Sequence, residues 1–422
     1  GIAYHEGDNS VASDDRLGIW SFRYTEPMTW WMPMPPEAPR TYAEALGILD
    51  RHLRGSSEPQ RQLAQAVRNS GTHDEHGAFN VEFQNAPWTN GAVWVLNPNP
   101  ALPCPPDEAT KATLSYTSAL ADRLYGPGSP GQLDGEYLDS IEGWADVLDY
   151  RPESLQRSSV PVTYATDELR PVVPTWFSVY ELARTMSEDL RRRGKLLMAN
   201  ATPWRIHAFA PLLDVMGTET NWMPGGAWRP DPDSVFCLRR SLCYRKPYLL
   251  LQNTDFDRFG PEQVERYFQR SMFYGVFPSM FSVDASTRNY WTQPQWYNRD
   301  RTLFRKYIPI ISQLSGAGWE PITGARSSRD DVYVERFGAR FVTVLNDSGQ
   351  RREVSLSLDR RTFGLLGNRA GIFNAVTGEA IVATTTRDRI ELRLTLEIEE
   401  CVVLRVDKAG ASPMESSQER RR

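Results

Sequence analysis

The sequence predicts an α/β fold in which a (β/α)8 barrel of the TIM type is followed by an antiparallel β-sandwich domain. From Ile19 to about Ser282, short apolar runs alternate with amphipathic helices, as in a parallel sheet built from βα units. A polar residue follows each of those runs. After about Ser327 the pattern changes to short β-rich runs separated by turn residues, which is typical of a sandwich.

Six barrel strands are expected from the apolar runs at residues 19–24, 135–138, 195–199, 213–217, 248–252 and 276–281. Helices are expected at residues 107–124, 175–193, 206–212, 234–244, 261–274 and 299–314. If residues 276–281 form strand eight, residues 19–24 form strand three, so the barrel is expected to lack its first two strands. The abrupt start without Met agrees with this and suggests a processed chain or a fragment.

The expected barrel domain covers residues 1–326, the sandwich covers residues 327–407, and residues 408–422 form a polar, disordered tail. Asn90-Gly91 predicts a hairpin turn, so we expect a hairpin near residues 78–97, inserted after the strand at 19–24. The alternative is that this segment supplies barrel strands. Sandwich strands are expected at residues 332–336, 340–346, 353–358, 371–374, 390–396 and 400–406.

Composition excludes several classes of function. A net charge of −5 and a pI near 5.7 argue against a nucleic-acid-binding protein, whose surface would be basic. No apolar run reaches the length of a membrane span, and no signal peptide is visible, so the compartment is not predicted. The four Cys have neither zinc-site nor disulfide-framework spacing, and His73 and His76 lie in a polar loop. Neither a metal nor an organic cofactor is predicted, and the oligomeric state is left open.

The residues that follow the predicted strands indicate where the chemistry lies, because catalytic groups of a parallel barrel sit at the carboxyl ends of its strands. Helix capping would explain one such polar residue, but Glu is a poor capping residue and occurs twice. The residues that follow the strands are Glu26, Asp139, Asn200, Glu219, Asn253 with Asp255, and Asp284.

Two of these acids are each followed by a Trp, at Trp144 and Trp222. A glycosidase needs this combination, because two carboxyl groups flank the scissile bond and sugar faces stack on aromatic rings. Asp139 is predicted to be the nucleophile, since it ends an apolar strand and the small Ser140 leaves room for a sugar. Glu219 is predicted to be the general acid/base, its pKa raised by apolar neighbours and by the charge of Asp139.

The alternative for Asp139 is a turn cap, and for Glu219 an ion pair with an arginine. Asp134 and Asp214 begin strands and are expected to be structural. Glu142 could bind a hydroxyl group or a cation, or be a solvated loop acid. The residues predicted to bind substrate are Glu26, Trp30, Glu142, Trp144, Asn200, Trp222, Asn253, Asp255 and Asp284.

The segments Tyr137-Leu138-Asp139 and Met216-Gly217-Thr218-Glu219 give the chain a resemblance to the retaining glycoside hydrolases of clan D. In that group a (β/α)8 barrel precedes a β-sandwich, the nucleophilic Asp ends strand four and the acid/base ends strand six. An Asp followed by a Glu is closer to the α-N-acetylgalactosaminidase-type families than to α-galactosidases, which use two Asp. Over roughly residues 1–406, the resemblance implies retaining hydrolysis of α-linked galactose- or N-acetylgalactosamine-type sugars in an oligosaccharide or glycoconjugate.

Two other functions remain open at this point. The missing strands favour a non-catalytic carbohydrate-binding protein on a degenerate barrel. A metal-dependent hydrolase or lyase would use Glu26, Asp139 and Asp284, although scarce His argues against a zinc enzyme. The most useful single observation is the distance between the carboxyl groups of Asp139 and Glu219. About 5–5.5 Å implies a retaining glycosidase, and roughly 6.5–9.5 Å implies an inverting one.

Overall fold

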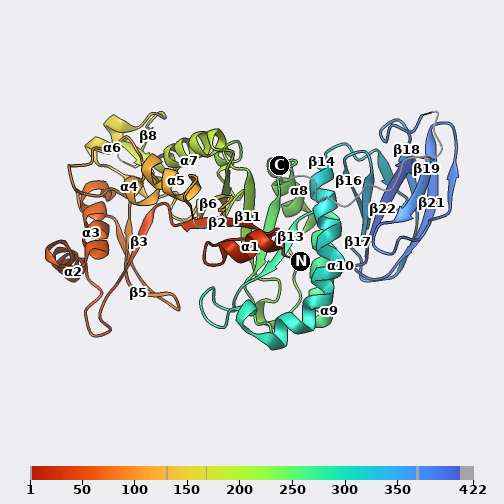
Figure 1. Ribbon diagram of the computed structural model, residues 1–422, viewed down its shortest axis with the longest axis horizontal. Helices are drawn as coiled ribbons and strands as arrows, with labels where there is room; N and C mark the ends of the chain where they lie inside the picture. The colour runs from red at the N-terminus through yellow and green to blue at the C-terminus, as the bar shows by residue number, and fades with distance from the viewer. Residues whose placement is uncertain (1, 130–131, 168, 367–369, 409–422) are drawn as a thin grey trace.

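A computed structural model describes residues 2–129, 132–167, 169–366 and 370–408 (Figure 1). Its centre is a parallel seven-stranded sheet with the order β1-β2-β6-β10-β11-β12-β13. The strands are β1 (Tyr4–His5), β2 (Trp20–Thr25), β6 (Gly135–Leu138), β10 (Leu196–Ala199), β11 (Val215–Thr220), β12 (Tyr248–Gln252) and β13 (Phe277–Met280).

The sheet curls without closing. Among the described residues, β1 and β13 are its two edges and do not pair with each other. The rings of Tyr4 and Phe277 nevertheless meet edge to face, 4.9 Å apart between centroids, so the two edges face one another. The described part of the chain therefore forms an open, curled sheet of seven strands, whereas the sequence predicts a barrel of the (β/α)8 type that lacks its first two strands.

All six predicted strands of this sheet are confirmed, but the expectation that both of the preceding strands are missing is wrong. β1 pairs in parallel with β2 and supplies one of them. It contains only two residues, which is too short to give a period-two pattern in the sequence. Close packing between strands is visible at Gly135, where a Cβ would lie 1.9 Å from the carbonyl oxygen of Leu196.

Helices and short 3-10 turns connect and cover the strands of the curled sheet. They are α1 (Val11–Leu17), α4 (Lys111–Ser115), α5 (Ser118–Tyr125), α7 (Thr175–Arg192), η1 (His207–Phe209), η2 (Pro224–Gly226), α8 (Asp233–Cys243), α9 (Pro261–Tyr274), η3 (Tyr290–Thr292) and α10 (Pro294–Ala317). The single helix predicted over 107–124 is two helices, because Tyr116 is extended and the Thr117 hydroxyl caps α5 at Leu120 N. The helix predicted at 206–212 is only the turn η1. None of the helices in the described ranges combines the length and apolarity of a membrane span.

An insertion of about 80 residues follows β2, so it stands beyond the carboxyl ends of the strands (Figure 1). It contains β3 (Thr29–Pro33), α2 (Tyr42–Arg54), α3 (Glu58–Ser70), β4 (Val81–Ala86) and β5 (Thr89–Val95), with strand order β3-β5-β4. A smaller sheet of β7 (Leu148–Asp149), β8 (Thr163–Tyr164) and β9 (Pro171–Pro174) lies further along the chain with α6 (Pro152–Arg157).

The predicted hairpin is present, and the alternative that its strands belong to the barrel is wrong. Its turn, however, is not Asn90-Gly91, because Ala86 pairs with Thr89 and leaves Pro87 and Trp88 between them. Gly91 instead lies within β5, where a Cβ would fall 2.1 Å from the carbonyl oxygen of Met32 on β3.

Two antiparallel sheets follow at the other end of the molecule (Figure 1). One has the order β14-β16-β17-β22-β19 and the other β15-β18-β21-β20. All six strands expected here are present, and β14, β15 and β20 are additional. The bounds are β14 (Trp319–Glu320), β15 (Ala325–Ser327), β16 (Val332–Phe337), β17 (Phe341–Asn346), β18 (Arg352–Asp359), β19 (Ala370–Asn374), β20 (Ala383–Thr385), β21 (Arg389–Leu396) and β22 (Cys401–Lys408).

The antiparallel sheets enclose their own core, and the outer face of the first sheet packs on α9 and α10. Phe337 and Phe341 belong to that contact and to the same apolar cluster as the parallel sheet. Of the predicted tail at 408–422, all but Lys408 lies outside the described residues.

Candidate functional site

At the carboxyl-end rim of the parallel sheet, the acids Asp139 and Glu219 share one amide group. Nδ2 of Asn200 donates to Oδ1 of Asp139 at 2.9 Å and to Oε1 of Glu219 at 2.8 Å. Nδ2 of Asn253 donates to the other oxygen of Glu219, Oε2, at 2.6 Å. These four residues follow or end β6, β10, β11 and β12, so the parallel order of the strands brings them together.

The shared donor limits the separation of the two acids. Oδ1 of Asp139 and Oε1 of Glu219 cannot be farther apart than the 2.9 and 2.8 Å bonds laid end to end, about 5.7 Å. Because the two N–H bonds of an amide nitrogen diverge by about 120°, two acceptors along them lie about 5 Å apart.

Backbone groups fix the orientation of both amides. The N–H of Ala201 donates to Oδ1 of Asn200 at 2.6 Å, and the N–H of Ser282 donates to Oδ1 of Asn253 at 3.3 Å. With each oxygen held in this way, each NH2 group points at a carboxylate. Ser140 and Ala201, next to Asp139 and Asn200, have φ values of 50° and 56°, so the chain turns sharply at both positions.

Three side chains donate to the Asp139 carboxylate. The Tyr24 hydroxyl donates to Oδ2 at 2.8 Å, and the Tyr137 hydroxyl joins Asn200 at Oδ1 with a distance of 3.0 Å. Burial and the nearby carboxylates raise the pKa of Tyr24, so its hydroxyl remains a donor. Tyr24 is 49% exposed, which shows that the cluster opens to solvent. Together the donors stabilise a negative charge on Asp139.

The surroundings of Glu219 favour its protonated form. Removal from water raises the pKa of Glu219, and the charge of Asp139 raises it further. The hydrogen bonds from Asn200 and Asn253 act in the opposite direction and are outweighed. The pair therefore combines a stabilised carboxylate with an acid that keeps its proton to a higher pH than an ordinary Glu.

Two further acids lie beside the pair, one predicted and one missed. Burial and the charge of Asp139 raise the pKa of Glu26 to about 8, while Lys111 lowers it in part. Burial, followed by the charges of Glu219 and Asp139, raises the pKa of Glu6 to about 8. Glu6 follows the two-residue strand β1, so only the expectation of another parallel strand before β2 could have pointed to it.

Two tryptophans that are predicted to bind substrate, Trp30 and Trp222, have their side chains in the interior. Trp30 is 8% exposed and packs against α2 and α3 in the core of the insertion. Trp222 is 1% exposed, and the rings of Trp228, Phe236 and Tyr267 surround it.

Glu142 has a structural role in place of the predicted hydroxyl or cation contact. It is fully buried and accepts hydrogen bonds from the backbone N–H groups of Trp204, Arg205 and Ile206 at 2.8–3.1 Å. It thereby ties the loop after β10 to the loop after β6. Trp204, which that loop carries, is 62% exposed.

Asp255 and Asp284 follow β12 and β13 as expected, but their carboxylates are engaged within their own turns. Asp284 accepts from the N–H groups of Ser286 and Thr287 and from the Thr287 hydroxyl. These bonds lower the pKa of Asp284 to about 2. Asp255 accepts from the N–H of Asp257 at 3.1 Å. Neither residue joins the cluster around Asp139.

Trp144 lies on the rim, in the loop that follows Asp139. Its ring meets Trp31 of β3 edge to face, with 5.2 Å between centroids, and Trp31 in turn meets Trp88 at 6.2 Å. The structure therefore places the predicted residue Trp144 in a group with two other tryptophans of the insertion.

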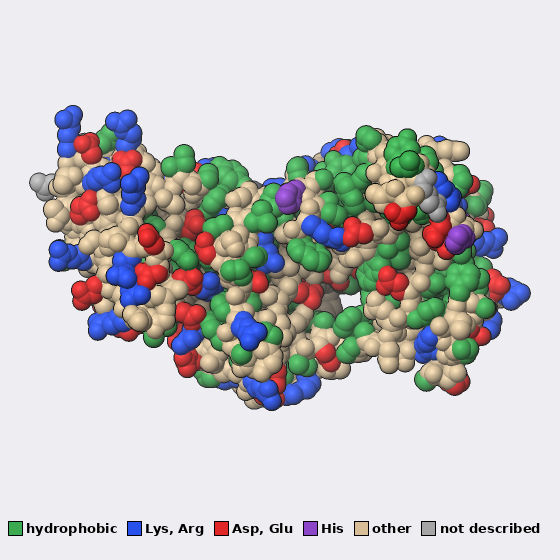
Figure 2. Space-filling model, turned by 180° about the vertical axis from the view of Figure 1, so that it is seen from behind, with side chains coloured by type: hydrophobic (Ala, Val, Ile, Leu, Met, Phe, Trp, Pro, Cys, Tyr) green, Lys and Arg blue, Asp and Glu red, His purple; other side chains and the backbone are tan. Residues whose placement is uncertain are grey.

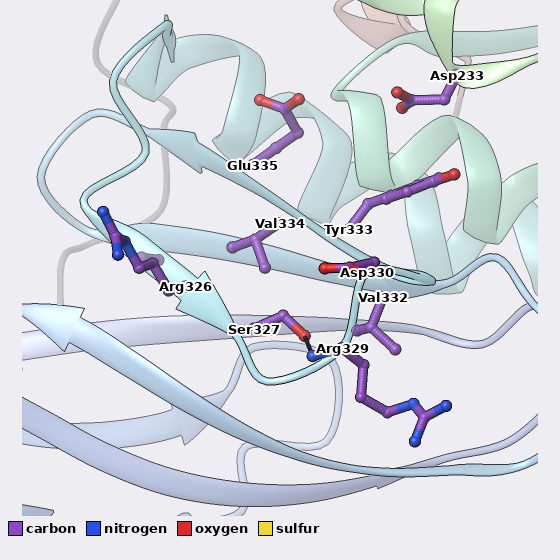
Figure 3. Close-up of a pocket in the computed structure, with 10 residues that line it drawn as sticks. Asp233, Arg326, Ser327, Arg329, Asp330, Val332, Tyr333, Val334 and Glu335 are labelled. Atoms are coloured by element: carbon purple, nitrogen blue, oxygen red, sulfur yellow. Dashed lines mark hydrogen bonds between the residues drawn. The ribbon is translucent and has the colours of Figure 1, made fainter.

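A separate hollow of about 350 Å³ lies on the antiparallel sheets, between β15, β16 and the start of α8 (Figure 3). Two of its acids bond to groups of the protein itself: Asp233 accepts from the Tyr274 hydroxyl and Glu335 from the indole N–H of Trp319. It contains none of the residues around Asp139. Within the described ranges, no group of three or more His, Cys, Asp or Glu side chains is arranged to hold a metal ion.

No known protein family matches the chain, and no curated protein matches its sequence. Among solved structures, it is similar to a glycoside hydrolase family 27 β-L-arabinopyranosidase from Geobacillus stearothermophilus, with 12% identity and a TM-score of 0.40 over 96% of this chain and 77% of the other. An α-N-acetylgalactosaminidase from Bifidobacterium bifidum has 12% identity and a TM-score of 0.43, and the match covers 80% of this chain and 42% of that enzyme. A cycloalternan-degrading enzyme from Trueperella pyogenes has 10% identity and a TM-score of 0.43, and the match covers 95% of this chain and 49% of that enzyme. Likeness at this level assigns neither activity nor substrate, so the function is argued from the site.

Proposed function

We propose that this protein is a glycoside hydrolase that acts by double displacement with retention, with Asp139 as nucleophile and Glu219 as acid/base. The observation that carries the proposal is the Asn200 amide that both carboxylates share. The upper limit of about 5.7 Å between the two bonded oxygens lies below the roughly 6.5–9.5 Å of inverting enzymes, which supports retention.

In the first step, a carboxylate oxygen of Asp139 attacks the anomeric carbon and forms a glycosyl ester. Glu219 donates its proton to the departing glycosidic oxygen, which leaves as an alcohol. In the second step, ionised Glu219 takes a proton from water, whose oxygen attacks the same carbon and releases Asp139. The raised pKa of Glu219 and the three donors to Asp139 suit these opposite roles.

The proposed substrates are α-linked galactose- or N-acetylgalactosamine-type sugars. Their support is the resemblance in the order Asp139 then Glu219. Burial and the neighbouring carboxylates raise the pKa values of Glu6 and Glu26, so both keep their protons to a higher pH than an ordinary Glu and would donate hydrogen bonds to hydroxyl groups of the bound sugar. The chemistry uses the carboxyl groups alone and needs neither a metal nor an organic cofactor.

The test is to follow hydrolysis of 4-nitrophenyl α-galactoside and α-N-acetylgalactosaminide by NMR and to record the anomer released first. We expect the α-anomer. A 2-deoxy-2-fluoro or 5-fluoro glycosyl fluoride of the same sugar should then label the peptide that contains Asp139, as seen by mass spectrometry. A β-anomer as first product, or a label on another residue, would contradict the mechanism.

A second candidate is a carbohydrate-binding protein without catalysis. The unpaired edges of β1 and β13 within the described chain favour it, because an open sheet holds its rim less rigidly than a closed barrel. Binding of these sugars without hydrolysis, in a wild-type protein that folds, would select this candidate.

A further inference from the structure

The insertion carries a feature that the carboxylate chemistry does not use. β3 begins at Thr29, whose hydroxyl donates to Glu26 in the acid cluster at 2.7 Å. Side chains alternate along a strand, and Trp30 and Met32 face the buried core under α2 and α3. Trp31 therefore shares the face of Thr29, one two-residue step or about 7 Å farther from the cluster.

Three indole rings gather on this face. Trp31 contacts Trp144 from the loop after Asp139 and Trp88 from the hairpin turn, both edge to face. We call Trp31, Trp88 and Trp144 the tryptophan platform. Unlike the enclosed ring of Trp222, all three retain exposed surface, and Trp88 is 51% exposed. Each edge-to-face contact uses the edge of one ring and one face of the other, so Trp88 and Trp144, which make one such contact each, both keep at least one face outside these contacts.

The neighbours of the platform suit sugar hydroxyl groups. Strand register places Val93 beside Trp31 and Glu82 on the far side of Val93, with Gln84 on the same face nearer the turn that carries Trp88. Glu82 is exposed and Gln84 half-buried, so both present hydrogen-bonding groups on the face that carries Trp31, with buried Val93 between Glu82 and Trp31. Aromatic faces with carboxylate and amide groups beside them match a sugar, which has an apolar C–H face and a rim of hydroxyls.

We propose that the tryptophan platform binds sugar units of an oligosaccharide beyond the scissile bond, so that the substrate is a glycan chain of several units. The occupant follows from continuity: Thr29 connects the platform to Glu26, and the loop of Trp144 begins at Asp139. The placement of these sugar units beyond the scissile bond rests on the proposed function. Glycan binding by the platform can be tested separately.

The binding experiment uses the Asp139→Ala variant on an array of galactose- and N-acetylgalactosamine-containing oligosaccharides of two to six units. Adding Trp88→Ala should weaken binding of chains of three or more units about tenfold, whereas Trp88→Phe should recover most of it. The matched control is Trp20→Ala, since Trp20 is 37% exposed and begins β2 at the opposite end of the sheet. Trp88 occupies an exposed turn, so its replacement should leave folding intact.

The kinetic experiment compares kcat/KM for a tetrasaccharide with kcat/KM for the aryl monosaccharide. Trp88→Ala should lower the ratio of the two about tenfold, and Trp20→Ala should leave it as in the wild type. Hydrolysis with an unaltered ratio would overturn the platform and keep the glycosidase. Glycan binding that depends on Trp88, in a protein that hydrolyses nothing, would keep the platform and overturn the proposed function. No glycan bound by the Asp139→Ala variant would overturn the platform.

Discussion

The two ends of the parallel sheet both carry acids, but different groups hold them. At the amino ends, Asp134 accepts the backbone N–H of Ser21 at 2.9 Å and Asp214 accepts that of Leu197 at 3.0 Å. At the carboxyl ends, phenol and amide side chains donate to Asp139 and Glu219. Acids held by backbone amides join one strand to the next, whereas acids held by side chains face an opening.

The same difference separates acids within the carboxyl-end rim. Glu142 and Asp284 follow strands as Asp139 does, yet backbone N–H groups occupy both. Position at a strand end is therefore insufficient to assign chemistry. The type of donor decides whether a carboxylate stabilises the fold or remains available to a ligand.

The largest expected effect comes from replacing one Asp at each end. Asp139→Ala removes the nucleophile and should lower kcat/KM for an aryl glycoside by about four orders of magnitude. Added azide or formate, which fits the vacated space, should restore part of the activity. Asp134→Ala should instead lower the free energy of unfolding by about 1–3 kcal/mol, measured in urea, and keep kcat near the wild-type value.

If both variants lost turnover equally while folded, the distinction between the two ends would be wrong. If Asp139→Ala remained active, the assignment of the nucleophile would fail.

A second pair compares two Glu residues of the rim. Glu219→Gln should lower kcat/KM, which covers only the step that forms the glycosyl ester, about 10²–10⁴-fold for a phenyl glycoside, which needs a proton on its leaving group. The loss should be much smaller for a dinitrophenyl glycoside, whose leaving group departs as an anion. Glu142→Gln should cost about 2 kcal/mol of stability and show the same relative activity on both substrates. Equal sensitivity of Glu219→Gln to both leaving groups would remove it as the acid.

Asn253→Ala should shift the pH dependence of kcat. Its hydrogen bond stabilises ionised Glu219, so its loss raises the pKa of Glu219 further. A general acid works only while protonated, so the alkaline limb should move about one unit to higher pH. A limb that stays in place or moves to lower pH would show that Asn253 does not support the anion.

The smallest effect concerns stability against pH at Glu6. Its pKa rises from 4.5 to about 8 on folding, so its contribution to stability is fully present below pH 4.5 and is lost as the pH rises toward 8. Glu6→Gln cannot ionise, so its Tm should exceed that of the wild type by about 3 °C at pH 8 and by less at pH 5. A Tm difference that is constant from pH 5 to 8 would contradict burial of Glu6 among the acids.

The sequence was sufficient for features that depend on local pattern. Apolar runs located the six strands, and the parallel order alone brings Asp139 near Glu219. It was insufficient where a neighbour distant in sequence decides the outcome. Trp30 and Trp31 are adjacent, and only the packing of α2 and α3 determines which of them is buried. Likewise, Glu142 is occupied by a loop more than 60 residues away.

The position of Asn200 limits how the spacing of the two acids can change during evolution. Its oxygen is anchored to the main chain and its nitrogen spans both acids, so the spacing that governs anomeric outcome belongs to the end of β10. Exchanging Asp139 for Glu, or Glu219 for Asp, would alter the reach of the carboxyl group but leave that anchor untouched. A switch to the opposite stereochemistry would require the backbone after β10 to shift. The stereochemical course therefore depends on the backbone of the fold and not on the two acids alone.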